Sequence, residues 1–500
     1  METIWVLGDQ LHRRLGAMAD ASPATHRILL VESVGKLRSK RWHRQRAHFV
    51  VASMRRFAAE LRETGFEVDH RRADSLRAGF AAHVEQFGPT RVLATEPASW
   101  DGLELLRDLE VDVVRSDQFL CHYEDFAEWA DGKQRFKMED FYRWQRTRLG
   151  YLMTPDDEPE GGRWNFDDQN REPPPKGTMN LWPAPQQSRL DDLDREVLAD
   201  LDDWGVDTWG ADPDGTWATS RRGALARLRH FVDDVLTQFG PHEDAMVESS
   251  WHLAHSVLSP YMNIGLLHPA EVCDAVQAAY DAGGVPINSA EGFIRQVIGW
   301  REYVWGVYWL WMPEYRGLNE LGADRPVPPV FRGDAETRMN CVSHCIDGLH
   351  DRAYAHHIQR LMVLGNLAML HGVDPWELTD WMWANFIDGA EWVMLPNVIG
   401  MSQWADGGKM ATKPYAAGGN YIDTMSDYCG GCSFDRKQRV GDDACPFTTL
   451  YWDFLARHHD RFVKNARIAR QVRASERLSD LPEVRERAVE VRRLLGAGEL

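Results

Sequence analysis

Four cysteines in the second half of the chain restrict its fold more than any other feature of the sequence. They are Cys341, Cys429, Cys432 and Cys445. A C-x2-C pair with two remote thiols suits either a tetrahedral zinc ion or an iron–sulfur cluster, and the proline after the last cysteine favours the cluster. Reduced, buried cysteines that pack as small hydrophobic side chains are the alternative. The two glycines of the C-G-G-C motif favour a metal centre, because glycine lets the backbone fold tightly around a ligand.

Length, charge and cysteine number bound the class of protein. A chain of 500 residues is expected to form several domains. It has no apolar run long enough for a membrane span and no basic leader, so we expect no membrane partner and a cytoplasmic protein. Seven cysteines, an odd number, favour thiols and metal over disulfides. The net charge of -19 counts against a nucleic-acid partner unless basic residues gather on one face.

Strand and helix patterns alternate through the first part of the chain. Strands are predicted at 3–7, 27–31, 66–69, 91–94 and 111–114, with helices at 49–64 and 76–86 between them. This alternation predicts a doubly wound, parallel α/β domain of the Rossmann-like type over residues 1–130. Ligands of such sheets bind outside the carboxyl ends of the strands.

The composition changes after this α/β part. A stretch rich in proline, glycine and acidic residues, without hydrophobic periodicity, predicts an interdomain linker over residues 131–195. Apolar residues then recur at three- and four-residue spacing, which predicts an all-α domain over residues 196–500. Its clearest helices are expected at 224–239, 290–311, 350–371 and 375–386.

An ordered series of motifs runs along the whole chain. It comprises Gly8-Asp9-Gln10-Leu11, Gly162-Arg163-Trp164-Asn165-Phe166-Asp167, Leu258-Ser259-Pro260-Tyr261, Ile298-Gly299-Trp300-Arg301, Tyr354-Ala355-His356-His357, Pro396-Asn397-Val398-Ile399 and the cysteine set. In this order the motifs resemble the cryptochrome/photolyase superfamily, and more narrowly the iron–sulfur bacterial cryptochromes and photolyases, the prokaryotic (6-4) photolyase type. The resemblance implies the cryptochrome/photolyase fold and three cofactors.

The first implied cofactor is FAD, bent into a U in the helical domain. The residues implied to contact it are Ser256, Leu258, Ser259, Asn263, Gln296, Arg301, Arg360, Asp388 and Met394. Within this set Arg360 and Asp388 match the family's salt bridge over the flavin ring. From the residues alone, Ser259 before a proline is also typical of the start of a helix.

The other two implied cofactors are a [4Fe–4S] cluster and an antenna. The resemblance assigns the cluster to Cys341, Cys429, Cys432 and Cys445, although the sequence alone does not choose between Cys341 and Cys345. The antenna is 6,7-dimethyl-8-ribityllumazine in the N-terminal domain. Its implied contacts are Gly8, Asp9, Gln10 and Glu32.

The implied activity is light-dependent repair of ultraviolet-damaged DNA by a monomer. Repair of a (6-4) photoproduct moves a group between two rings and needs a proton donor, for which histidine is suited. We predict that His357 is this donor, that His356 contacts the lesion, and that Tyr415 and Tyr421 line the lesion pocket. Without the family, an interfacial histidine pair bonded to backbone is the simpler interpretation. The rival hypothesis is a cryptochrome-like blue-light photoreceptor without repair.

The sequence departs from the family at two places. Trp381 matches the innermost tryptophan of the electron route, but no tryptophan occurs between Pro326 and Cys341, where the next is expected. Trp376, Trp383 or Trp392 could replace it, and the sequence does not rank them. Met394 stands where related proteins place a polar residue facing flavin N5. Since a thioether makes only weak hydrogen bonds, we expect faster reoxidation of the bound flavin or an altered stability of its semiquinone.

Overall fold

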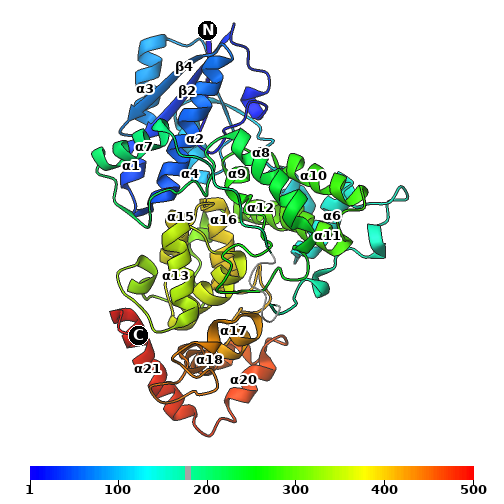
Figure 1. Ribbon diagram of the computed structural model, residues 1–500, viewed down its shortest axis with the longest axis vertical. Helices are drawn as coiled ribbons and strands as arrows, with labels where there is room; N and C mark the ends of the chain where they lie inside the picture. The colour runs from blue at the N-terminus through cyan, green and yellow to red at the C-terminus, as the bar shows by residue number, and fades with distance from the viewer. Residues whose placement is uncertain (175–181) are drawn as a thin grey trace.

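The computed structural model describes residues 1–174 and 182–500. Its N-terminal part is a five-stranded sheet in the order β4-β2-β1-β5-β6, parallel throughout (Figure 1). The strands are β1 (Glu2–Trp5), β2 (His26–Ser33), β4 (Glu67–Ala73), β5 (Val92–Thr95) and β6 (Asp112–Val114). The helices of this part are α1 (Val34–Arg38), α2 (Arg44–Glu63), α3 (Leu76–Phe87), α4 (Trp100–Asp108) and α5 (Tyr123–Ala130). The predicted doubly wound α/β fold is confirmed.

The central strands β1 and β2 are largely buried on both faces of the sheet, which is why they read as apolar runs. Along β2, Ile28 and Leu30 belong to the core that includes Phe49 of α2. Leu29 and Val31 point to the opposite face and pack in the core with Leu106 of α4. Successive strand residues therefore serve two separate helical layers.

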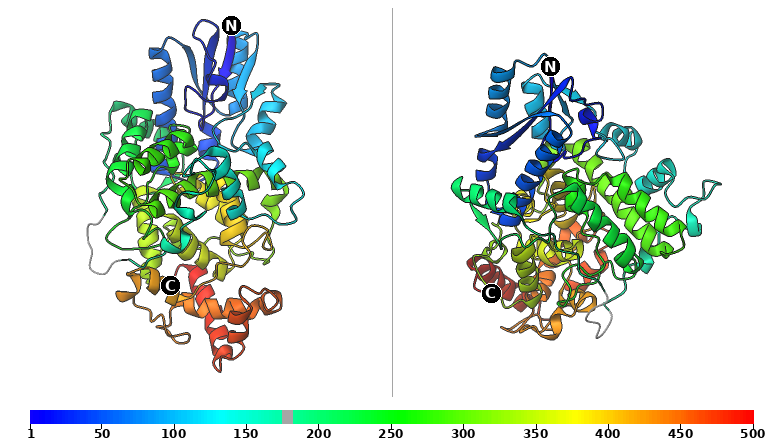
Figure 2. Two further views of the ribbon diagram at one scale, coloured as in Figure 1. Left: turned by 90° about the vertical axis from the view of Figure 1, so that its right-hand side faces the viewer. Right: turned by 45° about the horizontal axis from the view of Figure 1, so that its top comes forward.

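The rest of the chain is largely helical, as expected, and extends away from the sheet to the C-terminus (Figures 1 and 2). Its first helices are α6 (Met138–Leu149), α7 (Asp192–Asp203), α8 (Arg221–His230), α9 (Ser259–Asn263), α10 (Pro269–Asp281), α11 (Ile287–Ile294) and α12 (Glu302–Trp311). The next are α13 (Asn340–Arg352), α14 (Asn366–His371), α15 (Pro375–Asn385) and α16 (Glu391–Pro396). The last are α17 (Gly419–Met425), α18 (Pro446–Arg457), α19 (His459–Phe462), α20 (Ala469–Ser475) and α21 (Leu481–Ala497). One short strand, β7 (Thr208–Trp209), pairs with β3 (Trp42–His43).

The range predicted to be a linker is partly folded. It contains α6, whose Tyr142 is fully buried and packs on Gly299, and the first part of α7. Residues 175–181 of this range lie outside the described residues. Acidic side chains of α7 meet basic ones of α2: Arg55 pairs with Asp200 at 2.6 Å and Arg56 with Asp194 at 2.8 Å. The end of the linker is thereby attached to the α/β part of the chain.

The single helix predicted over 350–371 is wrong. Helix α13 ends at Arg352, and Ala353 adopts a left-handed conformation with φ of 54° while its N–H bonds back to Leu349. Residues 354–356 are not helical, and the chain becomes helical again at His357. Apolar spacing does not reveal this break, because the residues on both sides of it are buried. His357 consequently lies in the first turn of a new helix.

Among the described residues, four helical segments widen into π-helical turns, a feature that is frequent at functional sites. They are η4 (Phe231–Val235), η6 (Arg295–Arg301), η9 (Gln359–Gly365) and η10 (Asn397–Ser402). The predicted helix at 290–311 is therefore α11, η6 and α12 in succession. Among the described residues, none of the helices combines the length and apolar character needed to span a membrane.

Gly306 in α12 allows the close approach of α5. A Cβ on Gly306 would lie 2.1 Å from Phe126 Cγ, so an alanine there forces the ring to move. We expect Gly306→Ala to lower the free energy of unfolding by about 1–3 kcal/mol, the usual cost of overpacking. Gly496→Ala in α21 is the matched control, because no atom lies within 4 Å of the added methyl group. It should stabilise by about 0.5–1 kcal/mol through helix propensity, and urea unfolding of both variants measures the difference in sign.

Candidate functional site

A large pocket opens in the helical part of the chain, with a volume of about 1920 Å³ including its mouth. Three of the π-helical segments, η6, η9 and η10, contribute to its wall. Ten of the residues predicted from the sequence line it: Ser256, Ser259, Asn263, Gln296, Arg301, His357, Arg360, Asp388, Met394 and Tyr415. Residues as far apart in the chain as Ser256 and Tyr415 thus share one cavity.

An ion pair lies at the centre of this wall. Arg360 Nη1 is 2.9 Å from Asp388 Oδ1, and Arg360 Nε donates to the Ala355 carbonyl at 2.6 Å. Ser259 Oγ donates to Asp388 Oδ2 at 2.7 Å, and Asn263 donates to the Asp388 carbonyl at 2.8 Å. Ser259 makes no capping bond at the start of α9. The pair is held from both sides, so its orientation towards the pocket is fixed before any ligand binds.

Arg301 offers a second positive group. Its Nη1 lies 2.6 Å from Glu302, while its buried Nε has no hydrogen-bond partner among the described residues. Burial lowers the pKa of Arg301, although the nearby Glu302 carboxylate acts to raise it. A buried guanidinium N–H without a hydrogen-bond acceptor destabilises the protein unless a bound anion accepts a hydrogen bond from it. The wall therefore fits a ligand with a negatively charged portion, such as a diphosphate.

Three histidines meet at one end of the pocket. His356 is 1% exposed and stacks on His255 with ring centroids 4.6 Å apart. Burial drives the pKa of both rings well below the usual range. His357 lines the pocket, and its Nε2 lies 3.3 Å from Asp244 Oδ1. Burial lowers the pKa of His357, but the hydrogen bond and charge of Asp244 outweigh burial and raise it overall. The surroundings thus favour the charged form of His357 and the neutral forms of its two neighbours.

The contribution of Asp244 can be tested directly. We expect Asp244→Asn to lower the pKa of His357, because the amide keeps a polar contact but removes the negative charge. A pH titration of histidine-labelled protein by NMR measures this change. Asp234→Asn is the control, since Asp234 pairs with His230 at a different site. An unchanged His357 titration in Asp244→Asn would mean that another group sets this pKa.

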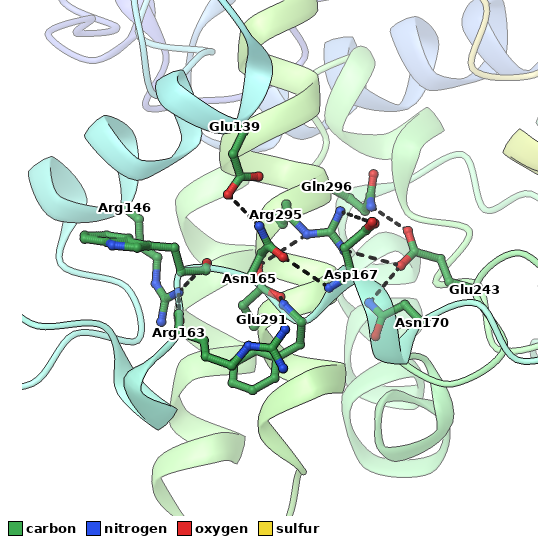
Figure 3. Close-up of polar contacts among 12 residues, drawn as sticks. Glu139, Arg146, Arg163, Asn165, Asp167, Asn170, Glu243, Glu291, Arg295 and Gln296 are labelled. Atoms are coloured by element: carbon green, nitrogen blue, oxygen red, sulfur yellow. Dashed lines mark hydrogen bonds and ion pairs between the residues drawn. The ribbon is translucent and has the colours of Figure 1, made fainter. Parts of the chain in front are cut away.

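A polar network that the sequence did not predict joins the loop at 163–170 to α11 and η6 (Figure 3). Arg295 lies 3.3 Å from both Asp167 and Glu291. Glu243 accepts hydrogen bonds from Asn170, at 3.1 Å, and from Gln296. Burial raises the pKa of Glu243 to about 7, although the charges of Arg295 and His357 act to lower it. Only the i,i+4 spacing of Glu291 and Arg295 signals any of this in the sequence.

Four predicted residues do not line the pocket: Leu258, His356, Trp381 and Tyr421. The Leu258 side chain is fully buried in the hydrophobic core, and its N–H donates to Ser256. The Trp381 indole N–H donates to the Phe331 carbonyl at 3.1 Å. Burial raises the pKa of Tyr421 to about 12. Of the candidate relay tryptophans, Trp392 lines the pocket, whereas Trp376 and Trp383 do not.

The residues predicted to hold the antenna lie after β1 and at the end of β2. Glu32 pairs with Arg55 at 2.8 Å and with His70 at 2.9 Å. Although burial acts in the opposite direction, these partners lower the pKa of Glu32 to about 2. The Gln10 amide donates to the carbonyls of Thr95 and Glu96, and Asp9 is half-buried next to Gly8. Glu32 and Gln10 already have protein partners, and an antenna contact by these residues stays a prediction.

The four predicted cluster cysteines line one small cavity, which Cys345 does not. Four thiols around one cavity suit either a tetrahedral zinc ion or an iron–sulfur cluster. Cys445 precedes α18, where backbone N–H groups of Phe447 and Thr448 reach its sulfur.

The glycines of the C-G-G-C motif are not needed for the backbone conformation. Neither Gly430 nor Gly431 has a positive φ. A Cβ at either position would meet no atom within 4 Å. Gly419 is the glycine that matters at this cavity, because a Cβ there would lie 3.0 Å from the Cys445 sulfur. The tight approach inferred from the sequence thus belongs to another segment.

Comparisons with known proteins match both parts of the chain. The family described as deoxyribodipyrimidine photo-lyase-related protein matches residues 4–217. A (6-4) photolyase of Agrobacterium fabrum is 40% identical over 491 residues, which cover 96% of each chain. A bacterial class III photolyase from Agrobacterium tumefaciens has a similar structure, with a TM-score of 0.59 at 15% identity over 99% of this chain and 98% of that one. A cryptochrome of Synechocystis sp. PCC6803 has a TM-score of 0.56 at 14% identity over 99% of both chains.

Proposed function

The chain belongs to the deoxyribodipyrimidine photo-lyase-related protein family, and from this premise we propose that it is a light-dependent enzyme that repairs (6-4) photoproducts in DNA. The observation that carries this proposal is one pocket lined by the Arg360–Asp388 pair, Arg301 and His357, whose pKa Asp244 raises. The relative with near full-length similarity, named a (6-4) photolyase, supports this choice of lesion. Ultraviolet-damaged DNA is then the substrate.

Membership of a photolyase family implies FAD, and the residues of the pocket fit it. We propose that Ser256, Ser259, Asn263, Gln296 and Arg301 bind the dinucleotide and that the Arg360–Asp388 pair orients the flavin ring. When bound and reduced, FAD supplies the photoexcited electron for repair. The unpaired Nε–H of Arg301 would donate a hydrogen bond to the diphosphate. The fully buried Leu258 side chain contributes to the core beneath this site.

His357 is proposed to donate a proton to the lesion. Asp244 favours the charged form of His357, whereas burial favours the neutral form of His356, which stacks on His255. A flipped base costs less to expose when damage has weakened its pairing. Tyr415, which lines the pocket, is proposed to contact the extruded lesion, and Tyr421 to support this wall.

The cysteine cavity is proposed to hold a [4Fe–4S] cluster on Cys341, Cys429, Cys432 and Cys445. The convergence of four cysteines on one cavity and the amides at the start of α18 support a thiolate-bound cluster there. The lumazine antenna is proposed for the α/β part at Gly8, Asp9, Gln10 and Glu32. The division into residues 1–130, 131–195 and 196–500 is proposed as the working domain layout.

The test uses chemically reduced protein under blue light. Oligonucleotides that carry either a (6-4) photoproduct or a cyclobutane dimer are illuminated with it, and chromatography measures restored thymines. We expect restoration from the (6-4) substrate. If neither substrate is restored while the protein retains flavin, the repair function is wrong and a photoreceptor role takes its place.

Met394 lines the pocket and is 3% exposed. We expect Met394→Glu to slow reoxidation of the bound flavin by air, because a carboxyl group can hydrogen-bond the ring where a thioether cannot. Stopped-flow absorbance after chemical reduction measures the rate. Met394→Leu is the matched control and should behave as the unaltered protein. Equal rates in all three proteins would show that residue 394 does not control reoxidation.

A further inference from the structure

Aromatic rings connect the pocket with the α/β part of the chain. Trp392, on the pocket wall, lies 5.8 Å from Trp305, measured between ring centroids. Trp305 lies 5.5 Å from Trp309, and Trp309 stacks on Tyr123 at 4.6 Å with an interplanar angle of 25°. The three indoles are buried, whereas Tyr123 is half-buried and reaches the surface. The series therefore runs from the pocket to solvent through residues of α16, α12 and α5.

Tyr123 has a proton acceptor at its hydroxyl. The phenol donates to Glu96 Oε1, and His122 Nε2 lies 2.6 Å from Glu96 Oε2. Burial raises the pKa of Glu96, but the hydrogen bonds of His122 and Tyr123 outweigh it and lower the pKa overall. Glu96 is therefore a carboxylate at neutral pH. A phenol gives up an electron easily only when its proton can leave, since its oxidised form is a strong acid.

The route through Trp381 ends at rings that are hard to oxidise. Among the aromatic pairs of the described residues, Trp381 contacts Phe331 and Phe386. Phe331 comes from the segment where the sequence predicts a second relay tryptophan. Phenylalanine cannot serve as an electron donor at potentials that oxidise tryptophan or tyrosine. A different set of rings has to reduce a flavin in this pocket.

We propose that Tyr123, with Glu96 as its proton acceptor, is the terminal electron donor of a relay through Trp309, Trp305 and Trp392. Trp392 would give one electron to the oxidised, photoexcited flavin that the pocket is proposed to hold, and the electron vacancy would pass outward through Trp305 and Trp309 to Tyr123. The phenol proton moves to Glu96 as the electron leaves, which yields a neutral tyrosyl radical and a protonated carboxyl group. A small-molecule thiolate returns one electron to the radical, the proton returns from Glu96, and two thiyl radicals combine to a disulfide. His122 positions Glu96.

This inference rests on the proposed function only in requiring FAD in the pocket. The test is electron paramagnetic resonance of the illuminated holoprotein without thiol. We expect a tyrosyl signal whose hyperfine pattern narrows when the protein carries ring-deuterated tyrosine. Its formation should slow in heavy water, because a proton moves with the electron.

Three variants locate the radical. Tyr123→Phe keeps the stack but removes the proton, and should lose the tyrosyl signal. Glu96→Gln keeps the hydrogen-bonding shape but removes the acceptor, and should lose the signal and the solvent isotope effect. Tyr280→Phe in α10 lies outside the series and should change neither. A tyrosyl signal that persists in Tyr123→Phe, or a wild-type signal from tryptophan alone, overturns the relay.

Chemically reduced Tyr123→Phe separates this relay from the repair function. It should still repair (6-4) oligonucleotides as the unaltered protein does, because reduction no longer depends on the relay. Failure of the unaltered, chemically reduced protein to repair would count against the proposed function alone. Loss of repair in reduced Tyr123→Phe, with repair intact in the unaltered protein, would contradict a role confined to flavin reduction.

Discussion

Replacing His357 with alanine is expected to slow repair of (6-4) photoproducts by roughly 10²–10⁴-fold, the usual contribution of general acid catalysis. His357 is the histidine of the pocket whose pKa is raised, since Asp244 stabilises its charged form. Its neighbours His255 and His356 have lowered pKa values and cannot supply a proton near neutral pH. Because the charged form is the reactive one, the repair rate should fall as pH rises through the pKa of His357. Quantified thymine restoration under limiting light measures both effects.

The control for this variant is His350→Ala. His350 is exposed at the end of α13 and contacts Asp351 outside the pocket. The His350→Ala substitution also removes an imidazole side chain, but it should leave the repair rate unchanged. His357→Asn would separate shape from proton donation, because asparagine keeps a hydrogen bond but is no acid. Repair by His357→Ala at the rate of the unaltered protein would exclude His357 as the donor.

The fold was predictable from the sequence because its signals are local. Apolar runs such as Ile28–Val31 followed by amphipathic helices define a parallel sheet. The break at Ala353 was not predictable in the same way. A single left-handed residue leaves no mark on apolar spacing when the segments on either side of it are both buried. It nevertheless decides that His357 begins a helix at the pocket instead of lying within one.

The site was predictable where one residue type carries the chemistry. The Arg360–Asp388 contact and the gathering of the four cysteines followed from motifs. Glu243 and Glu96 were missed, because a buried carboxyl group acquires its properties from neighbours far away in the chain. Glu96, for example, depends on His122 and Tyr123. Electrostatics of this kind is set by packing, which the sequence does not display.

Cys341 and Cys345 provide the sharpest comparison in the molecule. Both lie in α13, one helical turn apart, and both are buried. Cys341 lines the cavity with Cys429, Cys432 and Cys445, and Cys345 does not. We expect Cys341→Ala to lose bound iron and sulfide and to destabilise the surrounding core. Binding of a structural metal centre contributes free energy on the order of 10 kcal/mol, comparable with the whole stability of a domain.

Cys345→Ala should keep its iron and sulfide, and its only expected cost is about 1 kcal/mol for a buried sulfur. Chemical assay of iron and sulfide per chain, with thermal unfolding of both variants, measures the contrast. Cys432→Ala covers the case in which Cys341→Ala does not fold, because Cys432 lies nearer the surface and contributes less to packing. Loss of iron in Cys345→Ala with retention in Cys341→Ala would reassign the ligand to the next turn of α13. Full iron content in both Cys341→Ala and Cys432→Ala would mean that these cysteines only pack the core, which their convergence on one cavity argues against.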